Sequence, residues 1–377
     1  MRKLAYCSVP LALLGFACAS YAQSSVTLYG LIDSGLVYTS NAGGHSSLQQ
    51  GSVMAGSRWG LIGSEDLGNG LKAIFTLENG FNPANGKLGQ NGRMFGRQAF
   101  VGLSDNRFGS LTLGRQYMPN YTAPQSLTGT LSGGGAAAHP YDNDDLTYSL
   151  RNNNSVVYQS SNLGGFRFGA QYGFSNATNF ADSRSYSFSA AYGFGGLTLS
   201  SFYFQVNNEG STTNPNGTVA SGDAAFNAGR HRSWGAGAGY VFGSSTVNVL
   251  FTQTQLSNAT AIGAFAAGAS NNVPLTNPSA RFTNYELNYR YLITPAFSLA
   301  GAYTFTDGQL DGVRPKYHQV TVNATYSLSK RTDLYAEAIY QHVTGAGNSG
   351  ITAAIYNASR SSGNSQTVAT VGMRHRF

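Results

Sequence analysis

Two arginines stand inside stretches of chain in which apolar residues otherwise alternate with small or polar ones. Arg58 alternates against Trp59, and Arg151 alternates against Val156 and Tyr158. An arginine that faces lipid near the middle of a bilayer costs about 2–4 kcal/mol, whereas one that faces a water-filled lumen stays hydrated. If the apolar residues face outward, both guanidinium groups point into a lumen, where they can attract and orient ions.

Acidic residues that could oppose these arginines gather in one long connector, residues 118–152. A run of small residues at 133–138, able to lie against a crowded wall, is followed by three acids: Asp142, Asp144 and Asp145. Carboxylates that face guanidinium groups across a narrow gap create a transverse field, which passes small hydrated solutes and slows apolar ones. Asp33 and Glu78 are further inward-facing candidates on strands. The three aspartates could instead form a solvated loop tip or a cation-binding cluster.

No arrangement typical of catalysis accompanies these charges. The sequence contains no G-x-S-x-G, H-E-x-x-H or Walker-type motif, and its 6 histidines are scattered singly. The aspartates lack the spacing of an EF-hand. We therefore expect no enzyme, no cofactor and no metal ion, although a catalytic set assembled across strands is left open as an alternative.

The composition indicates which elements position these charges. Hydrophobic residues make up 41% of the 377 residues, but charged residues only 10%, against about 25% in soluble domains. After residue 22, no apolar run reaches the length of about 18 residues that a membrane helix needs. The chain is rich in Gly (48), Tyr (23) and Phe (22). This profile is typical of a transmembrane β-barrel, in which apolar and polar residues alternate.

The first 22 residues have the order of an export signal. Arg2 and Lys3 precede an apolar segment at 9–19, and the small residues around 20–22 would allow cleavage before Gln23. A buried helix or a lipidated Cys18 are the alternatives. We expect a signal peptide at 1–22 and one domain at 23–377.

Cleavage removes both cysteines, so no disulfide framework is expected in the exported chain. It leaves 21 basic and 16 acidic residues, a net charge of 21 − 16 = +5, with Lys and Arg scattered singly. That scatter argues against nucleic-acid binding.

The exported chain contains sixteen strand candidates of about ten residues each. They centre near 25–38, 57–65, 70–80, 95–104, 109–117, 153–160, 165–174, 184–194, 196–206, 232–242, 245–255, 281–292, 296–306, 316–328, 332–342 and 366–377. Their connectors alternate between short and long, as do the turns and loops of outer-membrane barrels. An even strand count lets the last strand close on the first, which leaves no unpaired edge in lipid. We expect an all-β, sixteen-stranded antiparallel transmembrane barrel; a soluble sandwich or a β-helix is the alternative.

Several segments together resemble one known family. They are 25–33 (SVTLYGLID), 57–73 (SRWGLIGSEDLGNGLKA), 96–103 (GRQAFVGL), 114–117 (GRQY) and 154–158 (NSVVY), with the terminal Phe377. These resemble the general diffusion porins of Gram-negative outer membranes, in the branch common in β-proteobacteria. The resemblance covers the whole exported chain and is densest over 25–160.

The resemblance implies a homotrimer of barrels, each with its third loop folded inward as a constriction. It also implies that Arg58, Arg97 and Arg151 form a basic wall opposite that loop, although the alternation around Arg97 leaves its direction open. Phe377 would be the signal that the barrel-assembly machinery reads. The chain lacks the Pro-Glu-Phe-Gly-Gly motif of enteric porin third loops, so the resemblance does not indicate which aspartate reaches the lumen.

Arg115 differs from the other arginines, because it shares the parity of Leu111, Leu113 and Tyr117, which should face outward. An outward arginine suits a contact between proteins or the lipid headgroup level. In the family this wall forms the trimer interface, so we expect Arg115 to take part in assembly.

The expected function is a passive, water-filled channel in the outer membrane for small hydrophilic solutes and ions. Its surroundings would be outer-membrane lipid and lipopolysaccharide. A solute-specific channel is the runner-up, and an outer-membrane enzyme or an adhesin barrel belongs to a different class. The sign of the charge selectivity is left open, because the acids named above could cancel the arginines.

Overall fold

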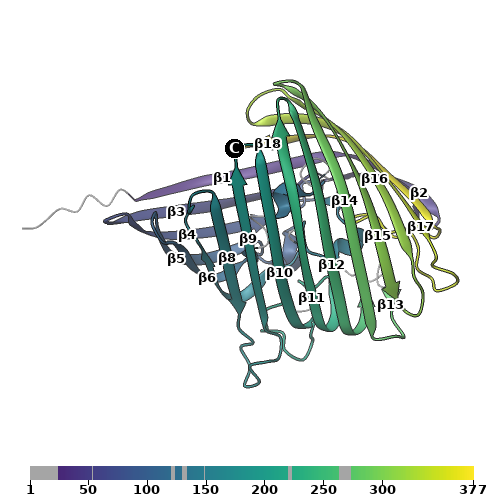
Figure 1. Cartoon of the computed structure of the whole chain (residues 1–377), viewed down its shortest axis with the longest axis horizontal. Helices are drawn as coiled ribbons and strands as arrows, with labels where there is room; N and C mark the ends of the chain where they lie inside the picture. Colours follow the sequence, from purple (N-terminus) through teal and green to yellow (C-terminus); the bar gives the residue numbers. More distant parts are fainter. Residues whose placement is uncertain are drawn as a thin grey trace, which may run out of the picture.

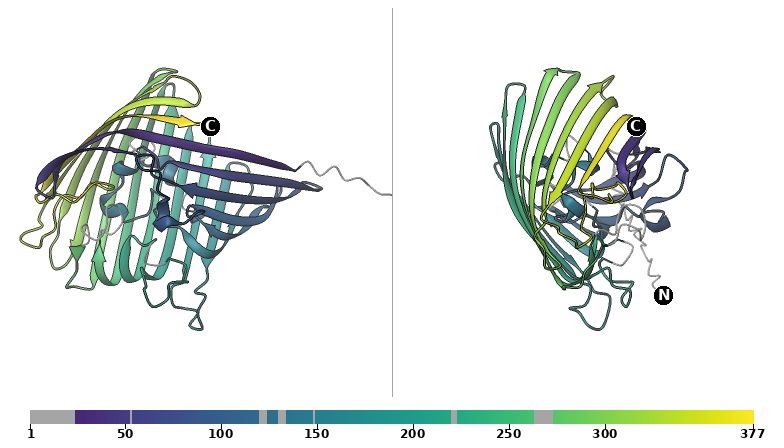
Figure 2. Two further views of the ribbon diagram at one scale, coloured as in Figure 1. Left: turned by 180° about the vertical axis from the view of Figure 1, so that it is seen from behind. Right: turned by 90° about the vertical axis from the view of Figure 1, so that its right-hand side faces the viewer.

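The protein is a single closed antiparallel β-sheet with short helical turns inside it (Figures 1 and 2). The computed structural model describes residues 24–52, 54–119, 124–129, 134–147, 149–219, 223–262 and 273–377. The predicted signal peptide at 1–22 lies outside these ranges. Among the described residues, no helix is long and apolar enough to cross a membrane.

Sixteen long strands form the wall, as predicted. They are β1 (Ser25–Ala42), β3 (Arg58–Gly68), β4 (Leu71–Gly80), β5 (Gln98–Asp105), β6 (Gly109–Gln116), β7 (Asn152–Gln159), β8 (Phe166–Gly173), β9 (Ser185–Phe194), β10 (Leu197–Glu209), β11 (Phe226–Phe242), β12 (Ser245–Ile262), β14 (Ser279–Thr294), β15 (Phe297–Leu310), β16 (Lys316–Ser327), β17 (Thr332–Thr344) and β18 (Ser365–Arg376). Two short strands, β2 (His45–Gly51) and β13 (Val273–Pro274), extend the sheet within connecting segments.

The barrel closes between its first and last strands. β1 pairs with β18 from Leu31↔Arg376 to Thr39↔Val368, and the terminal Phe377 exchanges backbone hydrogen bonds with Gly30. On its other edge, β1 pairs with β3 over Ser25–Leu31. From Gly35 onward, β1 pairs with β2, which folds back on it as a hairpin. Closure satisfies the backbone of both terminal strands, as lipid requires.

Alternation along each strand separates an apolar outer face from a polar inner face. Val249, Leu287 and Val322 are each at least 50% exposed, whereas their inward-facing neighbours Asn248 and Asn288 are buried. This pattern is the reverse of a soluble protein, because lipid, not water, contacts the outer face.

Short turns join the strands at one rim and longer loops at the other. The predicted turn before residue 70 is one of them: Gly68, Asn69 and Gly70 all have positive φ, and the Asp66 carboxylate accepts a hydrogen bond from the Gly68 amide at 2.8 Å. The strands on the loop side run further than the sequence indicated. β12, for example, has 18 residues, well beyond the ~9–11 that span a bilayer.

The third loop, between β6 and β7 and hereafter loop 3, has its described residues 117–119, 124–129, 134–147 and 149–151 inside the barrel (Figures 1 and 2). It contains the helical turns η2 (Pro124–Leu127), η3 (Gly135–Ala137) and η4 (Pro140–Asp142), while the short turn α1 (Gly89–Gly92) lies between β4 and β5. Met118, Tyr141, Leu146 and Leu150 of loop 3 join an apolar cluster whose other members, such as Phe282, come from the inner face of the wall. Loop 3 is therefore packed against the barrel wall.

Candidate functional site

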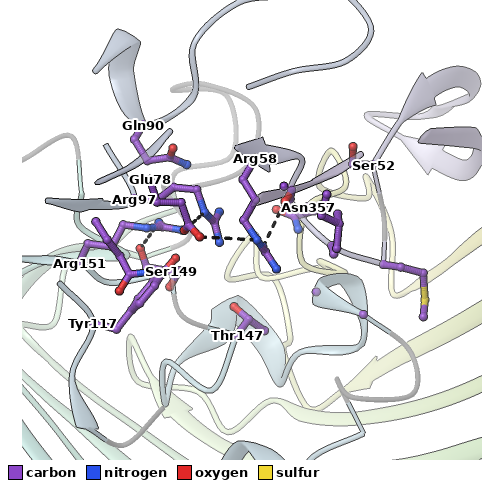
Figure 3. A pocket seen from close by; sticks show the side chains of 18 of the residues that line it. Ser52, Arg58, Glu78, Gln90, Arg97, Tyr117, Thr147, Ser149, Arg151 and Asn357 are labelled. Atoms are coloured by element: carbon purple, nitrogen blue, oxygen red, sulfur yellow. Dashed lines mark hydrogen bonds and ion pairs between the residues drawn. The ribbon is translucent and has the colours of Figure 1, made fainter. Parts of the chain in front are cut away.

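A cavity of about 720 Å³ lies in the lumen where loop 3 approaches the strands β1, β3 and β4 (Figure 3). Its lining includes the three arginines expected on the basic wall: Arg58, Arg97 and Arg151. Arg58 is the first residue of β3, and Arg97 and Arg151 immediately precede β5 and β7. The three guanidinium groups thus reach the lumen from the loop-side ends of every second strand, β3, β5 and β7.

Glu78 of β4 lies between two of these arginines. Arg97 Nε donates to Glu78 Oε1 at 2.7 Å, and Arg58 Nε lies 3.8 Å from Oε2. The Tyr29 hydroxyl donates to the same Oε2 at 2.8 Å. Glu78 lines the cavity, as expected of an acid at the constriction, but it stands on the basic wall rather than opposite it. The three arginines and Glu78 together carry 3 − 1 = +2 charges.

Arg151 is held by an aromatic face and by the loop backbone. Its guanidinium carbon lies 5.3 Å from the centre of the Tyr117 ring, and Nη1 donates to the Ser149 carbonyl at 3.0 Å. Only 7% of the residue is exposed, and within the described residues its Nε has no hydrogen-bond partner. A cation held over an aromatic ring in this way has a fixed position in the lumen.

The opposite side of the cavity carries neutral groups. Loop 3 contributes Gly134, Gly135, Thr147 and Ser149. The last loop, residues 345–364 between β17 and β18 and hereafter loop 8, also turns inward. It contributes Tyr356 and Asn357. Sequence reasoning missed loop 8 because nothing in its composition distinguishes an inward loop from an outward one.

Loop 8 is pinned by packing and by backbone hydrogen bonds. Ile355, 1% exposed, packs in a cluster with Ala136 and Ala137 of loop 3. The amide of Ile355 donates to Gln366 Oε1 at 3.0 Å, and that of Ala354 donates to Gln341 Oε1 at 2.8 Å. The two loops therefore narrow the lumen as one packed unit.

The expectation that the loop-3 aspartates face the arginines is wrong. Asp142, Asp144 and Asp145 are 1%, 0% and 3% exposed and do not line the cavity. Asp142 accepts from the Thr147 hydroxyl and amide, and Asp145 accepts from the Leu150 amide at 2.7 Å. A loop inside a barrel has backbone groups that water does not reach, and these carboxylates satisfy them.

Asp144 is turned toward the wall through a buried ion-pair chain. His139 Nδ1 lies 2.6 Å from Asp144 Oδ2, and His139 Nε2 lies 2.9 Å from Oε2 of Glu286 on β14. Burial lowers the pKa of His139, but the two carboxylates outweigh it and raise the pKa to about 10. His139 is therefore a cation at neutral pH and donates at both ring nitrogens. We name these three residues the loop-3 latch.

Asp33 is also misplaced by the sequence reasoning. It is fully buried and does not line the cavity. Its carboxylate accepts from the Tyr335 hydroxyl at 2.6 Å and from the Ala55 amide at 2.9 Å. The alternation along β1 correctly predicted that the Asp33 side chain points inward. The segment between β2 and β3, however, folds over this part of β1 and covers the carboxylate.

The outward direction expected for Arg115 is wrong, because the register of β6 against β7 shifts between Gly114 and Gln116. Arg115 is 9% exposed, and its guanidinium group binds the Asp223 carboxylate at 2.6 and 3.0 Å. Arg93 donates to the same carboxylate at 2.8 Å. These contacts lie within one chain, so the orientation on which the trimer-interface role rested is absent.

Other cavity residues could be recognised from the sequence only in part. Arg376 lines the cavity and donates to Asp333 at 2.9 Å. Because it is adjacent to Phe377, which faces outward, alternation along the last strand would have indicated that Arg376 points inward. Tyr29 follows the same alternation in β1. Across the described ranges, no three His, Cys, Asp or Glu side chains come together as a metal ion would require.

Comparisons with known proteins give one consistent result. Residues 10–375 match the model of a family described as Gram-negative porin. An outer membrane porin protein of Bordetella pertussis is 32% identical, with 97% of each chain covered. Outer membrane porin protein 32 of Delftia acidovorans is 31% identical, with 98% of this chain and 99% of the relative covered. Among solved structures, an anion-selective porin from Comamonas acidovorans is 27% identical, with a TM-score of 0.72 over 94% of this chain and 100% of that one.

Proposed function

The chain belongs to the Gram-negative porins, and on that premise we propose that its arginine-lined lumen passes small anions in preference to small cations. The coarser function follows from the family: the protein is an outer-membrane channel through which small hydrophilic solutes and ions diffuse passively. Its relatives are porins, which are channels rather than enzymes.

The preference for anions is supported by the charges around the cavity. Four guanidinium groups, those of the basic wall and of Arg376, line the cavity together with the Glu78 carboxylate, and the segments from loops 3 and 8 that line it bring no carboxylate. In a narrow gap bounded by protein, such a surplus raises the local concentration of anions and lowers that of cations. The relative from Comamonas acidovorans that is described as anion-selective supports the same sign.

The test is the reversal potential of the refolded full chain in a planar bilayer with a KCl gradient. We expect a potential on the side that indicates chloride preference, and ohmic single-channel steps. Raising the salt concentration on both sides should weaken the preference, because mobile ions screen the arginines. A reversal potential whose sign indicates potassium preference would contradict the proposal. An open channel with either selectivity would still support passive diffusion.

Loop 8 provides a second prediction about the same lumen. Replacing Tyr356 with alanine should increase the single-channel conductance, because the ring occupies cavity space next to Asn357. Tyr356→Phe is the matched control, since it keeps the ring and should leave the conductance near the wild-type value. Equal conductance of the alanine variant and the wild type would remove Tyr356 from the narrow part of the channel.

The homotrimer and the cleavage after residue 22 stay predictions. The resemblance to porins supports the homotrimer, and the order of basic residues, apolar segment and small residues in 1–22 supports the cleavage. A trimer would close in three equal conductance steps and migrate as one heat-labile species on a gel. Mass determination of the exported protein, with Gln23 expected as its first residue, tests the cleavage.

A further inference from the structure

The outer face of the barrel carries a group of arginines on the loop side of the strands β9–β15. They are Arg184, Arg230, Arg232, Arg281 and Arg314, and we call them the outer arginine band. Arg230, Arg281 and Arg314 are exposed. The band stands on the opposite face of the wall from the lumen, so the channel function does not use it.

Register places the centre of the band in one continuous row. Gln205 pairs with Arg232, Arg232 with Gln255, Gln255 with Arg281, and Arg281 with Gln309. The residues on either side of Arg232 and Arg281, such as His231 and Phe282, are fully buried in the lumen. Since successive side chains point to opposite faces, the whole row points outward. The row consists only of guanidinium and carboxamide groups.

An aromatic girdle lies directly beneath this row. Trp234 and Tyr285 are 42% and 50% exposed, and Phe251 contacts both rings, with centroids 5.2 and 5.4 Å away. Trp and Tyr mark the level where lipid tails meet headgroups. Arg232 is two residues from Trp234, and Arg281 is four from Tyr285. At about 3.3 Å per residue, the arginines lie roughly 7–13 Å further along the tilted strands than the girdle, on its headgroup side.

The band has no carboxylate partner within the described part of the chain. The arginine ion pairs formed there involve Arg58, Arg93, Arg97, Arg107, Arg115, Arg374 and Arg376, and no member of the band. Arg230 makes only a 3.3 Å hydrogen bond to the Ser257 hydroxyl. Asp311, the acid that shares a hollow with Arg281 and Arg314, accepts hydrogen bonds from the Thr276 and Asn277 amides at 2.7 Å.

A hollow of about 340 Å³ opens between the ends of β12, β14 and β15. Arg281 and Arg314 line it together with Gln255 and Gln309. Two guanidinium groups with neighbouring amide donors match the oxygens of a phosphate group, which arginine binds through two parallel hydrogen bonds. Asp311, also on its lining, has its Oδ1 directed to the loop.

We propose that the outer arginine band binds the phosphate groups of anionic lipid in the outer leaflet of the membrane. The lipid tails lie against the apolar face below the girdle, and the phosphate oxygens reach the guanidinium row above it. The position on the headgroup side of the girdle, the uncompensated charge and the hollow between Arg281 and Arg314 all fit this occupant.

Trp234 provides a reporter next to the band. The chain has 2 tryptophans, Trp59 and Trp234, so a Trp59→Phe background leaves the one beneath Arg232. The full chain is refolded into phosphatidylcholine vesicles with increasing fractions of brominated phosphatidic acid or brominated phosphatidylcholine. Bromine on the lipid tails quenches Trp234 when the lipid occupies this site. We expect the phosphatidic acid to quench several-fold more effectively at equal mole fraction.

The variant with Arg230, Arg232 and Arg281 replaced by glutamine should lose that difference. Arg290→Gln is the matched control, because Arg290 is exposed near the turn-side end of β14, away from the band. This variant should keep the stronger quenching by phosphatidic acid. Unchanged conductance and heat-labile migration show that the triple variant is folded. Equal quenching by the two lipids in the unsubstituted band overturns the proposal, as does an undiminished preference in the triple variant. Full displacement by inorganic phosphate would also overturn it, since a free anion would then be the occupant.

The same comparison with Trp59 retained is the second measurement, in case the Trp59→Phe background folds poorly. Trp59 then contributes a constant signal, and the difference between the native band and the triple variant still reports on Trp234. A fall in phosphatidic acid quenching on removal of the band is the expected result. No difference between the two proteins would overturn the proposal.

Discussion

Replacing Arg58 and Arg97 together with serine should abolish the anion preference and move the reversal potential toward cations. The basic wall carries 3 − 1 = +2 charges, from three arginines and Glu78, and on this wall the double variant retains Arg151 and Glu78, or 1 − 1 = 0. Arg376, the fourth arginine on the cavity lining, is neutralised by its contact with Asp333 at 2.9 Å and is the same in both proteins. Glu78 also loses both ionic partners, the nearer at 2.7 Å, so its carboxylate becomes free to attract cations. The measurement is the reversal potential in a planar bilayer with a KCl gradient, where we expect an anion-to-cation permeability ratio of about one.

Glu78→Gln is the matched change in the opposite direction. It raises the net charge of the basic wall from +2 to 3 − 0 = +3 and leaves the arginines in place. The preference for anions should therefore increase. A lysine double variant, Arg58→Lys with Arg97→Lys, keeps the charge and should keep the sign. If the serine variant has the wild-type reversal potential, the two arginines do not control the constriction.

Replacing His139 with alanine should release loop 3 from the wall and make the open channel noisy. The imidazolium of His139 lies between Asp144 at 2.6 Å and Glu286 at 2.9 Å, and all three side chains are 3% exposed or less. Removing the cation leaves two buried carboxylates with no counter-charge, which costs about 3–5 kcal/mol. The sixteen-stranded wall does not depend on this contact, so the barrel should stay folded while single-channel recordings show large current fluctuations.

His45→Gln tests the specificity of that result, because His45 is exposed on β2 and has no part in the latch. Combining His139→Gln with Asp144→Asn and Glu286→Gln removes all three charges at similar volume, and should restore quiet channels in part. Quiet wild-type-like channels in His139→Ala would mean that the apolar cluster alone holds loop 3.

The same latch predicts how the channel responds to pH. The pKa of His139 is raised above its ordinary value of 6.5 to about 10 by Asp144 and Glu286 against the effect of burial. The stabilisation is therefore complete below pH 6.5, and it decreases as the pH rises and is lost above about 10. Noise should appear in wild-type channels as the pH is raised toward 10, and His139→Gln should show no such step.

Two acids of loop 3 act on this pH response in opposite directions. Burial raises the pKa of Asp144, but His139 lowers it further, so the pair survives mild acid and breaks only when the pH falls below the usual range of a carboxyl group. Burial raises the pKa of Asp142 to about 6, so its charge, which disfavours the buried loop, develops as the pH rises through that value. Mildly acidic recordings should therefore give the quietest channels.

The strand pattern was decided by the sequence, and the reason is the solvent. Every second residue of a spanning strand contacts lipid, so Val249, Leu287 and Val322 had to be apolar, and this two-residue period is visible without any tertiary contact. The same constraint places Arg58 and Arg151 on the inner face. The sixteen strands, the closure of the barrel and the basic wall could thus be predicted. Arg97, whose neighbours are apolar on both faces, needed the resemblance to porins.

The loops and the strand ends were decided by tertiary structure. Asp144 and Asp145 point away from the lumen because loop 3 packs against β12 and β14 and needs carboxylates to satisfy its buried donors. Arg115 turns inward because one register shift breaks the alternation of β6, and Asp223, 108 residues away in the chain, supplies its partner. Such contacts join residues without any periodic relation, so local pattern carries no information about them. The sequence alone determined which strand residues contact lipid, because that contact repeats every second residue. Only the folded chain decided that the loop-3 carboxylates lie away from the cavity, because their partners are far apart in the sequence.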